Sequence, residues 1–148
     1  MNLLYTKPIL KDLSQGSRIS YIRQLRNLTQ DDVSDMLHLT GESKRRTMTR
    51  YEINERSPKE YRLKELSKIL LVSDDFIKQY DYKNELDIIY FLLWLDELFP
   101  NLYIELNTNN NTLNEFLLEW NEVKQKRKKR IITFEEYIEW KFSYRKEV

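Results

Sequence analysis

The chain has 148 residues, enough for one compact domain or two small ones, and its 41% hydrophobic and 13% aromatic residues can fill a core. Two glycines and three prolines argue against barrels, sandwiches and glycine-rich nucleotide loops, which need many special backbone angles. The formal net charge is only +1, and the absence of cysteine excludes disulfides, thiolate nucleophiles and zinc ribbons.

The helical spacing of apolar residues predicts a series of short helices in the first half of the chain. The first covers residues 17–27. Thr29 and Asp32 form a capping-box start for the second. A polar turn around Gly41 separates it from a third helix at residues 44–53.

Two further helix starts follow. In Ser57-Pro58-Lys59-Glu60, Ser57 is predicted to cap the fourth helix, with proline at its first position and Glu60 closing the box. Ser73 caps a short fifth helix. We therefore expect a five-helix domain over residues 1–82 with its core at residues 16–78.

The second half predicts a mostly helical module over residues 83–148. Apolar residues almost encircle residues 84–99, which is typical of a helix buried between two partners. LYIEL at residues 102–106 alternates like a strand, and its partner would be residues 130–133 or the same strand of a second subunit. Two amphipathic helices complete the module, the last starting at Thr133. The expected fold is mainly α with one short strand or hairpin, and the module is a candidate for dimerisation.

Basic side chains are concentrated in KRRTMTR at residues 44–50 and KQKRKKR at residues 124–130. The second segment lies at a predicted helix end, where a solvated face is favoured over an auxiliary phosphate contact. The three tryptophans lie on apolar helical stripes, which favours packing in a core or interface over stacking on bases. These are Trp94, Trp120 and Trp140.

Several motifs occur in a defined order within residues 16–77. They are Gly16 and Ile19, then Arg23, LTQDDVSDML at residues 28–37, RYE ending at Glu52, Pro58, and LKELSKILLVS at residues 63–73. In this order they resemble the lambda-repressor-like, or XRE, helix-turn-helix family of DNA-binding transcriptional regulators. The resemblance implies that the second helix crosses the phosphate backbone and the third enters the major groove.

The resemblance also implies roles for individual residues. Gln30 is expected to bond a phosphate and steady the recognition helix, and Arg23 and Glu52 are expected to form a partly buried ion pair. Asn54 stands where the family usually has glycine, and asparagine is the next-best residue for a left-handed helix end. GESK lengthens the turn before the recognition helix, so the DNA contacts are predicted only as a set. The set is Gln30, Lys44, Arg45, Arg46, Thr47, Thr49 and Arg50.

No acid, base and nucleophile converge in the sequence, so we expect no enzyme, cofactor or metal site. The only histidine, His38, lies near a predicted helix end and is read as exposed or capping rather than as a ligand. Three carboxylate pairs fall in first helical turns, where dipole complementarity and capping explain them. They are Asp31/Asp32, Asp74/Asp75 and Glu135/Glu136.

The N-terminal MNLLYTKPILKD lacks the basic start and apolar core of a signal peptide. The longest apolar run, at residues 88–95, is far shorter than the roughly 20 residues of a membrane helix. We therefore expect a cytoplasmic protein without a membrane segment. Its Lys-, Asn- and Ile-rich composition suggests an AT-rich bacterial or mobile-element genome.

These patterns predict a sequence-specific regulator that binds double-stranded DNA as a homodimer, on half-sites about one helical turn apart. Repression by occupying a promoter is the simplest mechanism. The alternative is a helix-turn-helix-derived adaptor or inhibitor, such as a phage anti-defence protein or an antitoxin, whose C-terminal module binds a protein partner. Specific, salt-sensitive binding to duplex DNA distinguishes the two.

Overall fold

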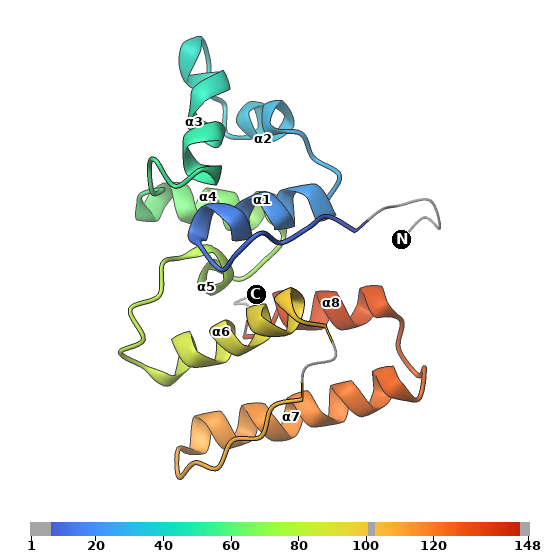
Figure 1. Ribbon diagram of the computed structural model, residues 1–148. Helices are drawn as coiled ribbons and strands as arrows, with labels where there is room; N and C mark the ends of the chain where they lie inside the picture. The colour runs from blue at the N-terminus through green and yellow to red at the C-terminus, as the bar shows by residue number, and fades with distance from the viewer. Residues whose placement is uncertain (1–6, 101–102, 146–148) are drawn as a thin grey trace. The chain divides into compact units, whose positions relative to one another are not determined.

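The computed structural model describes residues 7–100 and 103–145 (Figure 1). Within these ranges the chain forms eight α-helices and no β-strand, which confirms the expectation of a mainly α protein. The chain folds as two compact units. Unit 1 contains α1 to α5 and its continuous part ends at Gln79, whereas unit 2 spans Tyr80–Tyr144.

The helices of unit 1 bury one apolar stripe each against a shared core. Their bounds are α1 (Gln15–Leu25), α2 (Gln30–Met36), α3 (Glu42–Glu52), α4 (Glu60–Leu70) and α5 (Asp74–Ile77). The side chains with no exposed surface in this core are Ile19, Ile22, Val33, Met48, Leu66, Leu70, Phe76 and Ile77. The C-terminal end of α3 packs against the start of α1, and in Figure 1 the other end of α3 projects away from α1.

Side-chain caps set most of the helix starts in unit 1. The predicted capping box of α2 is confirmed, because the Thr29 hydroxyl accepts from the Asp32 amide at 3.0 Å and the Thr29 amide donates to the Asp32 carboxylate at 2.8 Å. Ser73 caps α5 as predicted. The predicted cap of α4 is wrong: α4 starts at Glu60, and the Ser57 hydroxyl instead donates to the Gln15 side chain at 2.7 Å.

The short helix α5 is held by polar side chains of α1. Arg18, only 2% exposed, donates to the carbonyl oxygens of Phe76 at 2.6 Å and Lys78 at 2.7 Å. Gln15 donates to the carbonyl oxygen of Ile77 at 2.7 Å. A four-residue helix cannot satisfy its own terminal carbonyls, so these donors replace the missing intrahelical bonds.

Unit 2 consists of α6 (Glu85–Leu98), α7 (Asn111–Lys128) and α8 (Phe134–Phe142). Asn84, Asn110 and Thr133 cap these helices, and the predicted capping box at Thr133 is confirmed. No residue of α6 is fully exposed, in agreement with its all-round apolar sequence.

Aromatic side chains form the core of unit 2. The rings of Phe116 and Trp120 stack with centroids 5.2 Å apart, and Trp94 packs on Phe142 at 5.5 Å. Trp94 and Trp120 are each 1% exposed, which confirms the prediction that they pack internally. Trp140 is half-buried and packs edge-on against Tyr144.

A buried polar network crosses this aromatic core. Lys141, 2% exposed, lies 2.7 Å from the Asp96 carboxylate and also pairs with Glu97. Tyr137 donates to Asp96 at 2.9 Å and accepts from the Trp120 indole at 3.0 Å. Burial and the neighbouring Asp96 charge raise the pKa of Tyr137 far above its usual range, so its hydroxyl keeps its proton. The sequence patterns did not predict this network.

The strand predicted at residues 102–106 is not found. Residues 103–106 adopt no regular structure, and residue 102 lies outside the described ranges. The proposed partner segment is also occupied: Arg130 has a positive φ of 60° just after α7, and Thr133 caps α8. An alternating sequence without a partner backbone cannot satisfy its own amides and carbonyls as a strand.

Candidate nucleic-acid interface

The basic segment KRRTMTR lies on α3, which begins earlier than the sequence predicted. Gly41 has φ 63° and ψ −142°, a conformation that residues with a Cβ rarely adopt, and the chain turns there directly into the helix. Glu42 and Ser43 therefore belong to α3 rather than to a lengthened turn. No side chain caps this helix start.

The two sides of α3 differ in burial. Thr47, Met48 and Tyr51 face the core, and Thr47 is only 9% exposed. Thr47 therefore does not share the exposed surface of Arg46 and Thr49, although it lies between them in the sequence. The exposed side, which we call the α3 face, consists of Glu42, Ser43, Arg45, Arg46, Thr49 and Arg50.

The C-terminal end of α3 is fixed to the start of α1. Asn54 has φ 64°, as its position predicted, and the Glu55 amide donates to the Arg50 carbonyl at 2.9 Å, so α3 ends in a Schellman motif. The Asn54 side chain also accepts from the Gly16 amide at 2.8 Å and donates to the Ser14 hydroxyl at 3.0 Å. One asparagine thus ends α3 and completes the cap of α1.

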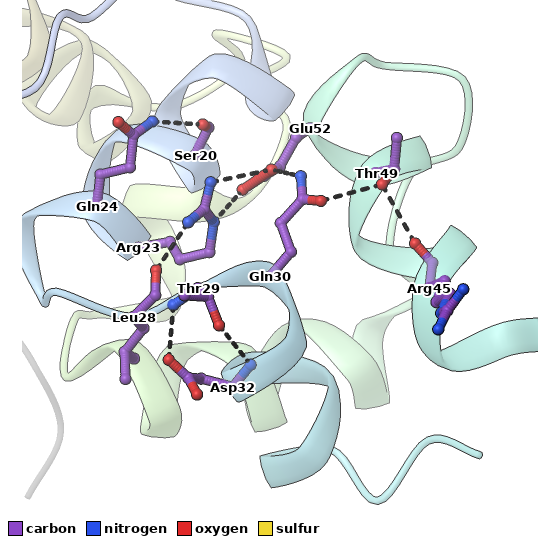
Figure 2. A network of polar contacts seen from close by, with 10 residues as sticks. All are labelled: Ser20, Arg23, Gln24, Leu28, Thr29, Gln30, Asp32, Arg45, Thr49 and Glu52. Atoms are coloured by element: carbon purple, nitrogen blue, oxygen red, sulfur yellow. Dashed lines mark hydrogen bonds and ion pairs between the residues drawn. The ribbon is translucent and has the colours of Figure 1, made fainter. Parts of the chain in front are cut away.

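A polar network joins α1, α2 and α3 (Figure 2). Arg23 Nε lies 2.5 Å from Glu52 Oε1, with side chains only 12% and 6% exposed, so the ion pair expected from the resemblance is present. Gln30 donates to the other oxygen of Glu52 and accepts from the Thr49 hydroxyl at 3.1 Å. Through these contacts the first residue of α2 holds the middle and the end of α3 in one position.

Acidic neighbours offset much of the positive charge of α3. Lys44 is half-buried and its ammonium lies 2.7 Å from the Asp35 carboxylate, a hydrogen bond that raises the pKa of Lys44 above its usual range. Two looser pairs involve arginines of the α3 face: Arg46 lies 3.7 Å from Glu42, and Arg50 lies 3.9 Å from Glu55, just beyond the helix. Such exposed pairs are worth little in water, so these arginines can exchange partners at low cost.

Arg45 differs from the other basic residues of α3. It is exposed, and in the part of the chain that the structure describes no carboxylate pairs with it. Its carbonyl oxygen accepts from the Thr49 hydroxyl at 3.2 Å, and Figure 2 shows its side chain pointing away from Gln30. Arg45 therefore has the greatest freedom to bind an external anion.

The second basic segment, residues 124–130, is partly engaged in packing. The Lys124 ammonium lies 3.5 Å from the centre of the Trp120 ring, and burial lowers the pKa of Lys124. Arg127 lies over Phe134 at 5.9 Å. The remaining basic side chains of the segment are exposed on the last turn of α7 or just beyond it.

Other sequence features have structural explanations. The three predicted carboxylate pairs all lie in first helical turns. His38 is exposed, with φ 58°, just after the end of α2. Across residues 7–100 and 103–145 no group of three or more histidine or acidic side chains could hold a metal ion. No helix in those ranges has both the length and the apolar character needed to cross a bilayer.

Comparisons of the chain with known protein families, curated proteins and solved structures found no match.

Proposed function

We propose that residues 1–82 form a lambda-repressor-like helix-turn-helix domain that binds a specific double-stranded DNA sequence through α3. The observation that carries the proposal is the α3 face. It presents Arg45, Arg46, Thr49 and Arg50 on one exposed side of a helix whose opposite side is buried. Arginine can bind guanine with two hydrogen bonds, and threonine can contact a base or the thymine methyl group.

The network behind α3 suits a helix that must read bases. Base readout requires a fixed helix, because a displaced side chain loses the geometry of a bidentate hydrogen bond. Thr49 is tied to Gln30, and Arg23 and Gln30 both bind Glu52. In the proposed complex Gln30 keeps these contacts and bonds a phosphate from the start of α2, as in the family that the chain resembles.

The charge balance of α3 favours selective over general binding. Phosphate contacts supply affinity for any duplex, whereas base contacts supply discrimination. Because Lys44, Arg46 and Arg50 have acidic neighbours, we expect weak binding to random DNA at physiological salt. At a cognate site, hydrogen bonds to base edges and phosphates replace the contacts with those acidic neighbours. The new contacts offset the free energy of losing the old ones.

In this proposal the protein is a homodimeric repressor that acts in the bacterial cytoplasm and is encoded by a bacterial or mobile-element genome. A two-fold pair of α3 helices would meet half-sites about one helical turn apart on the same side of the DNA.

Selection of bound duplexes from a random library, followed by fluorescence anisotropy at several salt concentrations, tests the proposal. We expect one enriched sequence, bound at least about 1,000-fold more tightly than random DNA. Arg45→Ala, Arg46→Ala and Arg50→Ala should each cost about 1–3 kcal/mol of binding free energy. Lys68→Ala on the exposed side of α4 is the control and should leave affinity unchanged. Equal and weak binding of all duplexes would overturn the proposal.

A protein-binding adaptor or inhibitor is the second candidate. It is favoured by the acidic residues that offset the charge of α3 and by the large apolar side chains exposed on unit 2, among them Leu118 at 70% and Ile131 at 67%. The adaptor function would be favoured if no duplex is enriched and if the arginine variants bind duplex DNA with the same affinity as wild type.

A further inference from the structure

The outward side of α7 carries an exposed stripe that nothing in the described chain covers. Leu118 is 70% exposed in the middle of the helix, and Ile131 is 67% exposed just beyond its end. A shallow hollow lies between them along the helix surface. Its lining, which we call the α7 stripe, consists of Leu118, Asn121, Glu122, Gln125, Lys126, Lys129 and Ile131.

Charge along this side of α7 is separated by sign. Glu115, Glu119 and Glu122 are exposed in the first two-thirds of the helix, and Lys126 and Lys129 follow them. Within the described residues none of these five side chains forms an ion pair. The helix dipole does not account for the acidic group, because the first turn of α7 contains no acid and the dipole acts only within the first and last turns.

The separation is unfavourable for α7 alone. Glu115 and Glu119 are four residues apart, Glu119 and Glu122 three, and Lys126 and Lys129 three, so like charges are neighbours on the helix surface in three pairs. Glu122 and Lys126, four residues apart, are the single neighbouring pair of opposite sign among these five side chains. An external surface that brings lysines to the acidic half and carboxylates to the basic half would relieve both repulsions. The α7 stripe of a second copy has this arrangement when its direction is reversed.

We propose that the α7 stripe is a homodimer interface in which two α7 helices pack antiparallel about a two-fold axis. The axis passes between Glu122 and Gln125. Glu119 and Glu122 then face Lys126 and Lys129 of the second copy, and by symmetry the same pairs form again on the other side. Leu118 approaches the end of the second helix, where Ile131 completes the apolar contact.

In an antiparallel pair about a two-fold axis, the same flank of each helix lies beside its symmetry copy. Successive residues turn by about 100°, so Glu115, Glu119, Glu122 and Lys126 share one flank of α7. A two-fold axis perpendicular to both helices brings that flank onto its own copy, so acidic and basic side chains meet rather than diverge. A partner of single charge sign would match only half of the stripe.

The expected dimer is weak and sensitive to salt. The 18 residues of α7 span about 27 Å, and one helix pair of this length lies at the small end of specific interfaces. DNA with two half-sites would hold the copies together at high effective concentration. As an account of how the regulator spans two half-sites, the inference rests on the proposed function, but the self-association can be measured without DNA.

Two charge-reversal variants of the full chain test the interface. Glu119→Lys/Glu122→Lys leaves Glu115 as the single acid among these five charged side chains, and Lys126→Glu/Lys129→Glu makes all five acidic. All four side chains are exposed, and circular dichroism checks that each variant folds. In sedimentation equilibrium at low salt we expect wild type to dimerise, and each variant alone to dissociate with a dissociation constant at least about tenfold higher. An equimolar mixture of the two variants should form a heterodimer.

Lys68→Glu on α4 is the control and should dimerise like wild type. A monomeric wild type at about 100 μM, homodimers of either variant as stable as wild type, or a mixture that stays monomeric would each overturn the interface. Binding of each variant to a single half-site is measured in parallel. Loss of dimer with intact half-site binding supports the interface, whereas absence of half-site binding in all proteins refutes the proposed function and leaves the dimer result valid.

Discussion

Gly16 lies so close to the end of α3 that a Cβ atom at this position would stand 2.5 Å from the carbonyl oxygens of both Tyr51 and Glu52. These are backbone atoms, so no side-chain rotation can make room. The Gly16 amide also donates to Asn54, which ends α3. The contact between α1 and the recognition-helix candidate is therefore a contact between backbones, and it requires glycine.

Gly16→Ala should destabilise unit 1. Alanine normally stabilises a helix interior relative to glycine by about 0.5–1 kcal/mol, but here the added methyl group has no space. We expect a net loss of about 1–3 kcal/mol in the free energy of unfolding, the usual range for overfilling a packed site. Urea unfolding followed by far-ultraviolet circular dichroism measures this loss.

The tryptophans provide an internal reference for that experiment. Trp94, Trp120 and Trp140 all lie in unit 2, so their fluorescence transition should stay at the wild-type urea concentration. Ser20→Ala on α1 is the control, because it removes only an exposed hydrogen bond from Gln24. A Gly16→Ala protein as stable as wild type would contradict the close approach.

The Arg23–Glu52 ion pair should behave as one unit in a double-mutant cycle. Arg23→Met leaves Glu52, which is 6% exposed, without its cation, and Glu52→Met leaves Arg23, 12% exposed, without its anion. Each single change should cost about 3–5 kcal/mol, and the double variant should cost clearly less than the sum. Circular dichroism of urea unfolding provides the energies. Strictly additive losses would show that the pair contributes no coupling.

Glu42→Gln should strengthen binding to random duplex DNA if α3 contacts DNA as proposed. Glu42 is an exposed carboxylate on the α3 face and lies 3.7 Å from Arg46, so it both repels phosphates and engages a cation. We expect affinity to rise about two- to fivefold at low salt, the equivalent of an exposed ion pair. Glu60→Gln on α4 is a matched control, because Glu60 forms a pair of the same spacing and length with Lys64. Equal gains from both variants would indicate a general charge effect.

Tyr137→Phe should destabilise unit 2. The Tyr137 hydroxyl bonds both Trp120 and Asp96, and its loss leaves a buried indole N–H without an acceptor. We expect a cost of about 1–3 kcal/mol, measured by tryptophan fluorescence during urea unfolding. Tyr103→Phe is the control, because the Tyr103 side chain is 78% exposed and its hydroxyl bonds only the exposed Glu105. Similar losses from both changes would mean that the buried network contributes no special stability.

Acid should weaken the start of α2. Hydrogen bonds from the Thr29 backbone and side chain hold the pKa of Asp32 below its usual 3.8. The folded state therefore favours the carboxylate, and this contribution to stability is present above pH 3.8 and is lost as the pH falls through the lower folded-state pKa. Nuclear magnetic resonance titration of Asp32 should give a midpoint below 3.8. Asp32→Asn should remove the contribution, whereas Asp31→Asn removes the same charge without touching the cap. A midpoint at or above the usual value would contradict the capping box.

Features set by neighbouring residues were predictable from the sequence. The capping boxes at Thr29 and Thr133, the cap at Ser73 and the left-handed Asn54 all agree with the structure. In each case the groups that satisfy the backbone lie within a few residues, so local chemistry is sufficient. The mainly helical class follows from the same periodicity and from the scarcity of glycine and proline.

Features that depend on distant residues were decided only by the tertiary structure. Ser57 bonds Gln15 instead of capping α4, and Thr47 is turned into the core although it stands between exposed arginines. The alternating segment at residues 102–106 predicted a strand, but the described part of it finds no partner backbone. The sequence by itself thus determined where α2, α5 and α8 begin and which segments are basic. Packing between helices decided which of those basic side chains face outward and which acids pair with them. Burial and ion pairing depend on contacts between residues that lie apart in the sequence.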